Sequence, residues 1–232
     1  MMPQPASAHK LIDSSGSNDR FSTSLIIPDH KISWAIYENI SPNGIKFYEF
    51  QAKAGDDFYS QIVVPKLKSL ENFTPTLVLV GPGIFSDDMK ISNMTFPDEI
   101  KNHIYKYHGT VPSEEFYEPF GQVTYWLRQE VRTSIPADGT YYLLVFDTQG
   151  TGGKYSLAVG EIEDFKLLDF ITILPTAWFK TKLFFDDYIS FSIAVLVISG
   201  IISLIVFGIV DIRRKNARNA EKKKSDKNNI KF

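Results

Sequence analysis

Hydrophobic and polar residues alternate with a period of two along much of the chain between residues 21 and 160. In residues 45–52, for example, Phe47 falls on one face, and Tyr48 and Phe50 fall on the other. Such alternation indicates strands with one buried face. The expected strands are residues 32–37, 45–52, 58–64, 76–80, 123–135, 139–146 and 154–159.

Turn signals separate these strands. Pro42-Asn43-Gly44 predicts a β-hairpin with its flanking strands, because Asn-Gly accepts the positive φ angles of a type I′ turn. The glycine-rich stretch 149–153 predicts a second hairpin near the end of the pattern. Short strands with little helix between them predict a mainly β fold, an antiparallel β-sandwich or jelly roll over residues 21–160.

The pattern changes after residue 188. Residues 189–210 form a run of 22 residues without a charged side chain. A helix of that length, with a rise of about 1.5 Å per residue, would be about 33 Å long, which matches the hydrocarbon core of a bilayer. The sequence therefore predicts one C-terminal transmembrane helix and a single-pass protein of the cell membrane.

Charge is distributed unevenly around this apolar run. Residues 211–232 contain nine of the 25 lysines and arginines but three of the 27 aspartates and glutamates. Basic residues beside a span favour the cytoplasmic side, so Arg213, Arg214 and Lys215 predict a cytoplasmic tail and an extracytoplasmic N-terminal domain. The tail is expected to be disordered and to lie near anionic lipid. Nucleic-acid binding is not expected, because the tail has no aromatic residue before its last position.

The N-terminus and the absence of cysteine constrain the exported domain. With no cysteine, the domain has to be stable through its own core. Residues 1–20 are rich in Ser, Asp and Pro and are expected to be flexible. Ala6-Ser7-Ala8 has the small-x-small pattern of a signal-peptide cleavage site, so this stretch is either the end of a signal peptide or an ordinary flexible terminus.

Residues 161–188 are expected to form a juxtamembrane amphipathic helix. Large apolar side chains dominate the segment, and polar ones recur every three to four residues. Trp178, Phe179 and Lys182 suit the headgroup boundary, where aromatic rings and long basic side chains are favourable. We interpret the segment as an interfacial helix that seats the sandwich on the outer leaflet. The alternative is a helix packed against the domain itself.

Two stretches of strand and turn resemble a known family. Residues 47–56 place a small-Gly-Asp turn after an aromatic strand, and residues 136–145 match the pattern Pro-x-x-Gly-x-Tyr-x-x-x-Val. A Gly-Gly turn followed by residues 155–159 completes the pattern. Together they resemble the bacterial pre-peptidase C-terminal-like β-sandwich, here on a single-pass anchor. The resemblance implies an accessory module that is not itself catalytic, and the chain departs from it between Gly83 and Gly121.

The candidate chemistry lies in the long loop expected over residues 84–120, because long loops in compact domains are often functional. Aromatic side chains anchor partners when they are exposed, and bury themselves when such a loop folds back. The candidate binding residues are Tyr105, Tyr107, Phe116, Tyr117 and Phe120. His103 and His108, with Glu114 or Glu115, are candidate copper or zinc ligands, and Asp87-Asp88 suits either calcium or a solvated turn.

Motifs for catalysis do not stand out. The sequence has no Gly-x-Ser-x-Gly, no His-Glu-x-x-His, no phosphate-binding glycine loop before a helix and no thiol. We therefore expect a protein that is not an enzyme and holds no cofactor. It would be a membrane-anchored extracytoplasmic binding or scaffolding protein, for example an accessory subunit of a membrane complex, with membrane lipid and a membrane or cell-surface protein as partners. The alternatives are a metal-dependent ectoenzyme that uses the 84–120 loop and a structural protein that contacts the cell wall.

Overall fold

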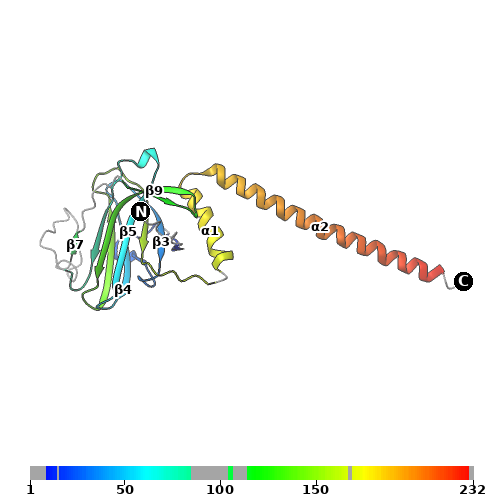
Figure 1. Cartoon of the computed structure of the whole chain (residues 1–232), viewed down its shortest axis with the longest axis horizontal. Helices are drawn as coiled ribbons and strands as arrows, with labels where there is room; N and C mark the ends of the chain where they lie inside the picture. The colour runs from blue at the N-terminus through cyan, green and yellow to red at the C-terminus, as the bar shows by residue number, and fades with distance from the viewer. Residues whose placement is uncertain (1–8, 15, 85–103, 107–113, 167–168, 230–232) are drawn as a thin grey trace. The chain divides into compact units, whose positions relative to one another are not determined.

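The computed structural model describes residues 9–14, 16–84, 104–106, 114–166 and 169–229 (Figure 1). The chain divides into two compact units, Met1–Phe185 and Asp186–Phe232. The first unit contains a β-sandwich and helix α1 (Asp169–Phe184), and the second contains helix α2 (Tyr188–Asn229). The mainly β fold with a helix after it and one long C-terminal helix, as predicted, is confirmed.

Two sheets form the sandwich. The six-stranded sheet has the order β1 (Lys10–Leu11), β3 (Trp34–Ile40), β11 (Gly153–Val159), β5 (Asp57–Pro65), β9 (Val123–Ser134) and β8 (Glu115–Glu118). The five-stranded sheet has the order β2 (Leu25–Ile26), β4 (Ile45–Ala52), β10 (Gly139–Phe146), β6 (Thr76–Val80) and β7 (Ile104–Lys106). Neighbouring strands are antiparallel, except that the short strands β1 and β2 pair in parallel with β3 and β4. The 3-10 helices η1 (Phe21–Thr23) and η2 (Lys68–Leu70) lie in the connections.

Both predicted hairpins are wrong, because the strands on either side of each turn belong to different sheets. β3 pairs with β1 and β11, whereas β4 pairs with β2 and β10. β10 and β11 are likewise separated. A turn motif specifies that the chain reverses, but it does not specify the strand with which the next strand pairs.

The turn after β3 also differs from the predicted type. The N–H of Gly44 donates to the carbonyl oxygen of Ser41 at 2.8 Å, which makes Pro42 and Asn43 the central pair. Asn43 has a φ angle of +56°, whereas Gly44 is not among the residues with positive φ. Proline fixes its own φ near −65°. The combination is that of a type II turn rather than a type I′ turn.

The alternation predicted for residues 45–52 is confirmed, since β4 covers the same residues. Tyr48 and Phe50 point between the sheets, where they are 0% and 1% exposed. Phe47 lies on the opposite face, and the ring of Phe21 covers it with 4.5 Å between the ring centroids. Burial of one large apolar side chain contributes about 1.5–3 kcal/mol, so this alternation is a main source of stability.

One end of the core holds an ion pair. Glu38 and Lys46 are 6% and 7% exposed, and Lys46 Nζ lies 3.9 Å from Glu38 Oε1. Ser14 Oγ donates to Glu38 Oε2 at 2.6 Å, and Lys46 Nζ donates to the carbonyl oxygen of Gly16 at 2.7 Å. Buried charges require such partners. Residues before Phe21 therefore complete the sandwich at this end.

α2 is apolar over its first half. Large hydrophobic side chains on it are exposed, among them Ile189 at 76% and Leu204 at 73%. The stretch Tyr188–Asn219 is long and apolar enough to cross a membrane, judged by length and composition.

The helix also continues through the basic residues to Asn229, which differs from the disordered tail expected for residues 211–232. Extension of an existing helix requires no new nucleation. Lys215 Nζ lies 2.8 Å from Asp211 Oδ2, a pair at the i, i+4 spacing that stabilises helices.

His30 is buried at the other end of the sandwich from Glu38. It is 2% exposed, with the rings of Phe50 and Phe58 at 5.2 and 6.1 Å between centroids. Its Nδ1 lies 3.1 Å from the carbonyl oxygen of Gln51, so in the neutral imidazole Nδ1 carries the proton. Nε2 has no hydrogen-bond partner and lies 3.5 Å from Asp56 Oδ2. Burial lowers the pKa of His30 below its ordinary value of 6.5, and the carboxylate of Asp56 opposes this only in part.

This burial predicts that the free energy of unfolding falls as the pH drops below 6.5. In that range the unfolded chain binds a proton at His30, whereas the folded chain, with its lower pKa, does not. The non-titrating variant His30→Gln is expected to lose less stability than the wild type between about pH 7 and about pH 5. Urea unfolding of the full chain in detergent micelles, followed by tryptophan fluorescence, measures the two slopes. Equal slopes would contradict the prediction.

Candidate functional site

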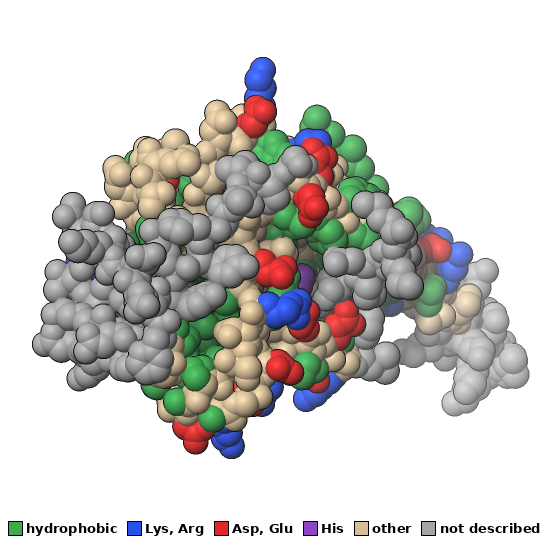
Figure 2. Space-filling view, turned by 60° about the vertical axis from the view of Figure 1, so that its left-hand side comes forward, with side chains coloured by type: hydrophobic (Ala, Val, Ile, Leu, Met, Phe, Trp, Pro, Cys, Tyr) green, Lys and Arg blue, Asp and Glu red, His purple; other side chains and the backbone are tan. Residues whose placement is uncertain are grey.

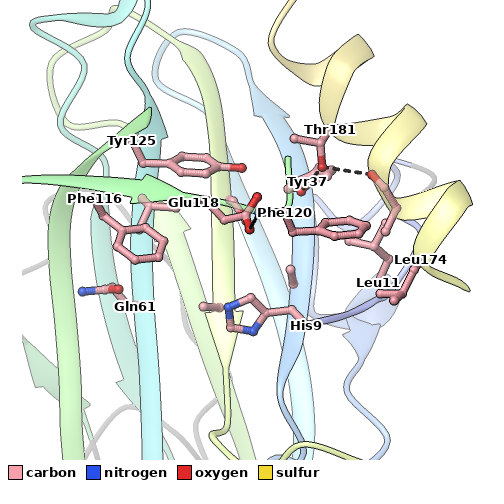
Figure 3. A pocket seen from close by; sticks show the side chains of 15 residues that line it. His9, Leu11, Tyr37, Gln61, Phe116, Glu118, Phe120, Tyr125, Leu174 and Thr181 are labelled. Atoms are coloured by element: carbon pink, nitrogen blue, oxygen red, sulfur yellow. Dashed lines mark hydrogen bonds between the residues drawn. The ribbon is translucent and has the colours of Figure 1, made fainter. Parts of the chain in front are cut away.

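A cavity of about 80 Å³ lies between the six-stranded sheet and α1 (Figure 3). It is on the outer face of the sheet, opposite the core. All six strands of that sheet or the residues beside them contribute to it, and α1 closes it. Much of the lining is apolar: Leu11, Ala35, Val63, Ala158, Leu174 and Ala177.

Two aromatic rings lie on one side of the cavity (Figure 3). Phe116 is on the edge strand β8 and Tyr125 is on β9, and the two residues are direct partners in the β8–β9 register. Val63 on β5 packs in the same apolar cluster as Tyr125 and Phe116. Phe120, from the turn after β8, also lines the cavity and is 38% exposed, so it lies where the cavity meets solvent.

A chain of hydroxyl groups fixes α1 to the sheet. Thr181 Oγ1 donates to the carbonyl oxygen of Ala177 at 2.9 Å and lies 2.7 Å from the hydroxyl of Tyr37. Because threonine has one hydroxyl proton, Tyr37 is the donor in the second bond. The hydroxyl protons of Tyr37 and Thr181 therefore point in one direction, from the sheet toward the helix backbone. Thr181 is 2% exposed, which removes water as an alternative partner.

Ring contacts attach the last turn of α1 at the same place. The ring of Tyr37 stacks on Phe184 with 4.5 Å between centroids and 10° between planes, and Tyr125 meets Phe185 edge-on at 4.9 Å. Lys154 Nζ donates to the carbonyl oxygen of Phe184 at 3.2 Å, at the helix end where a cation is favourable. Burial raises the pKa of the Tyr37 hydroxyl and raises the pKa of Tyr125 well above its ordinary value. Both tyrosines therefore remain neutral hydrogen-bond donors.

Polar side chains also line the cavity. They include His9, Gln61 and Glu118. His9 Nδ1 lies 2.6 Å from Ser33 Oγ, and burial lowers the pKa of its imidazole. The two carboxylate oxygens of Glu118 accept hydrogen bonds from the backbone N–H groups of Phe120 at 2.7 Å and Gly121 at 2.5 Å. Glu118 therefore holds the turn between β8 and β9 in place.

The structure brings two of the five predicted binding residues into this cavity. Phe116 and Phe120 line it, whereas Tyr117 faces the other side of the sheet and is 57% exposed. Tyr105 lies on β7, at the edge of the five-stranded sheet, and Tyr107 lies outside the described residues. Tyr105 and Phe116 therefore belong to different sheets, and the predicted group does not form one surface around the cavity.

The predicted metal ligands are not placed by the structure. His103, His108 and Asp87-Asp88 lie outside the described residues, so that site stays a prediction. Of the two glutamates proposed with them, Glu115 lies 2.7 Å from Lys66 Nζ. Within the part of the chain that the structure describes, no group of three His, Asp or Glu side chains is arranged to hold a metal ion.

The residues predicted to face lipid lie on α1, which packs against the sandwich. The rings of Trp178 and Phe179 meet edge-on at 5.2 Å, and Lys182 Nζ lies 5.3 Å from the Trp178 centroid. Lys182 is 3% exposed, so its side chain is covered by protein. Contact of these three with lipid stays a prediction. Ala177 and Thr181 were not predicted as site residues, and their only signal in the sequence is the i, i+4 spacing that puts them on one helix face.

The hydroxyl chain predicts the effect of Tyr37→Phe. The ring can still stack on Phe184, but the Thr181 hydroxyl loses the donor that it has inside the protein. We expect a loss of about 1–3 kcal/mol in the free energy of unfolding, with faster amide hydrogen exchange in α1. Tyr117→Phe removes a hydroxyl from an exposed ring and serves as the control. Unchanged exchange in α1 of the Tyr37 variant would mean that the hydroxyl chain does not hold the helix.

Comparison with known proteins gives similarity of fold. No protein-family model and no curated protein matches the chain. The periplasmic inhibitor of g-type lysozyme, PliG, from Aeromonas hydrophila is similar at 14% identity and a TM-score of 0.35, over 66% of this chain and 98% of that one. PliG from Salmonella Typhimurium is similar at 18% identity and a TM-score of 0.31, over 60% and 98%. The pre-peptidase C-terminal domain of a Bacillus anthracis collagenase is similar at 14% identity and a TM-score of 0.31, over 58% and 91%. The chain thus resembles the pre-peptidase C-terminal domain at the level of the fold alone.

Proposed function

We propose that the chain is a single-pass membrane protein whose β-sandwich lies outside the cytoplasm and binds a protein partner there. The main observation that supports a membrane anchor is the exposed apolar surface of α2. Leu196, Leu204 and Phe207 are 71%, 73% and 72% exposed. Apolar surface on this scale is unfavourable in water, whereas the hydrocarbon core of a bilayer accommodates it.

The charges beside α2 support the orientation. Arg213, Arg214 and Lys215 follow the apolar stretch immediately, and basic residues there favour the cytoplasmic side. The sandwich precedes the stretch and would lie on the other side. Figure 2 shows acidic and basic side chains intermixed on one face of the molecule. The charges on that face are therefore mixed, and it has no uniform positive field that would select a polyanion. Arg132 and Glu161 form an ion pair, with 2.7 Å between Nη1 and Oε2.

The geometry of this cavity suits a side chain of a protein partner better than an enclosed small molecule. A volume of about 80 Å³ is far below the roughly 300–1,000 Å³ of pockets that enclose small-molecule ligands. It is of the size of a side chain from a partner protein. The polar groups around it hold the structure together, since Glu118 binds two backbone amides and Thr181 belongs to the hydroxyl chain. A partner that inserts an apolar side chain beside Phe116 and Leu174 fits this chemistry.

The topology is tested by single-cysteine labelling, which the cysteine-free chain makes unambiguous. Lys53→Cys, in the exposed turn after β4, is expected to react on intact cells with a maleimide that cannot cross membranes. Asn216→Cys is expected to react only after the membrane is permeabilised. The protein is also expected to stay in the membrane pellet in alkaline carbonate. The opposite labelling pattern would invert the orientation, and release by carbonate would remove the anchor.

The binding role is tested by purification from membranes in mild detergent. A partner is expected to co-purify in fixed stoichiometry with the wild type. Leu174→Arg places a charge in the apolar lining and is expected to reduce recovery of the partner at least about tenfold, which corresponds to about 1.4 kcal/mol. Lys53→Glu, in the exposed turn after β4 and outside the lining of the cavity, is the matched control. Absence of any stoichiometric partner would favour a structural protein that acts alone.

A further inference from the structure

The chain that connects the last turn of α1 to the start of α2 is short. The backbone N–H of Phe185 donates to the carbonyl oxygen of Thr181 at 3.0 Å, and its ring lies against Tyr125. Two residues, Asp186 and Asp187, then precede Tyr188, where α2 begins. Three residue steps of extended chain reach about 10 Å. If α2 spans the membrane, as proposed above, the last turn of α1 cannot lie farther than this from the point where the span begins.

The turn between β8 and β9 lies directly beside that last turn of α1. A Cβ atom added to Gly121 would come within 2.7 Å of Thr181 Cγ2, so the glycine permits this close approach. The same turn is held from the other side by the carboxylate of Glu118, which accepts from the backbone of Phe120 and Gly121. Gln122 has a φ angle of +54°, which reverses the chain into β9. The turn is therefore a fixed structural element that stays with the end of α1.

Exposed apolar side chains gather at this end of the first unit. Among its described residues, five large hydrophobic side chains are exposed, and three of them belong to the β8–β9 corner or the last turn of α1. The three are Tyr117 at 57%, Phe120 at 38% and Leu183 at 43%. Exposed aromatic rings are unfavourable in bulk water but are enriched where hydrocarbon meets headgroups, because a ring is apolar and polarisable.

We propose that the β8–β9 corner is a second, peripheral membrane contact, in which Phe120 and Tyr117 rest in the headgroup region of the outer leaflet. The partner is the bilayer interface itself. The inference rests on the proposed anchoring by α2. It differs from a helix lying along the membrane, because the contact is made by a strand turn, while Ala177 and Thr181 keep one face of α1 on the sheet.

The contact would fix the orientation of the sandwich relative to the bilayer. A span with two linking residues leaves the domain free to tilt, whereas a second contact removes that freedom. The cavity beside Phe116 and Leu174 would then lie close to the membrane surface, where a membrane-embedded partner can reach it.

The test uses the full chain in lipid nanodiscs, with one cysteine introduced at a time. Phe120→Cys is labelled with an environment-sensitive fluorophore, and the lipids carry a nitroxide quencher at the headgroup. Quenching at position 120 is expected to be at least about threefold stronger than at the control Lys53→Cys, in the turn after β4, because contact quenching requires proximity. A thermal unfolding curve for each variant checks that the sandwich is intact. A second labelled site, Tyr117→Cys, replaces position 120 if Phe120→Cys does not fold.

Three outcomes separate the possibilities. Equal quenching at positions 120 and 53 overturns the peripheral contact. A third label at Leu196→Cys, read with a nitroxide deep in the acyl chains, reports the span itself. If position 196 is quenched and position 120 is not, only the peripheral contact fails. If position 196 is not quenched either, the anchoring by α2 fails as well.

Discussion

The position of α1 depends on two hydroxyl groups that are buried between the helix and the six-stranded sheet. Each has a single proton, and the protons run in one direction, from Tyr37 to Thr181 and on to the carbonyl oxygen of Ala177. An unpaired buried donor or acceptor costs about 1–3 kcal/mol, so the helix has one favourable register on the sheet. A shift by one residue would replace Thr181 with a lysine. The cavity beneath α1 exists because this register places the small side chain of Ala177 over the sheet.

Each end of the sandwich core contains buried polar side chains, but their interactions differ. At the end near the β8–β9 turn, Glu38 and Lys46 form an ion pair, in which Glu38 accepts a hydrogen bond from Ser14 and Lys46 donates one to the carbonyl oxygen of Gly16. At the other end, His30 is held neutral by burial and keeps one nitrogen without a partner. The first arrangement ties the N-terminal residues to the core. The second makes the stability of the far end sensitive to acid.

Sequence periodicity predicted the strands well and their pairing poorly. The limits of β4 and β6 agree with the expected residues 45–52 and 76–80, because alternation and turn residues are local properties. The sheet to which a strand belongs is set by packing between residues far apart in sequence, so Pro42-Asn43-Gly44 could not distinguish a hairpin from a crossing between sheets. Of the residues that line the cavity, Phe116 and Phe120 were predicted from the sequence as candidate binding aromatics. Thr181 and Ala177 were missed because their role exists only once α1 meets Tyr37.

The placement of the last two strands has a consequence for biosynthesis. β10 is the middle strand of the five-stranded sheet, and β11 lies between β3 and β5 in the six-stranded sheet. Neither sheet can form completely before residues 139–159 are present. Until then β4 and β6 lack the strand that joins them, and so do β3 and β5. The sandwich therefore stays open until residues close to the apolar stretch after Tyr188 are available, and its strand edges are exposed to wrong pairing throughout that interval.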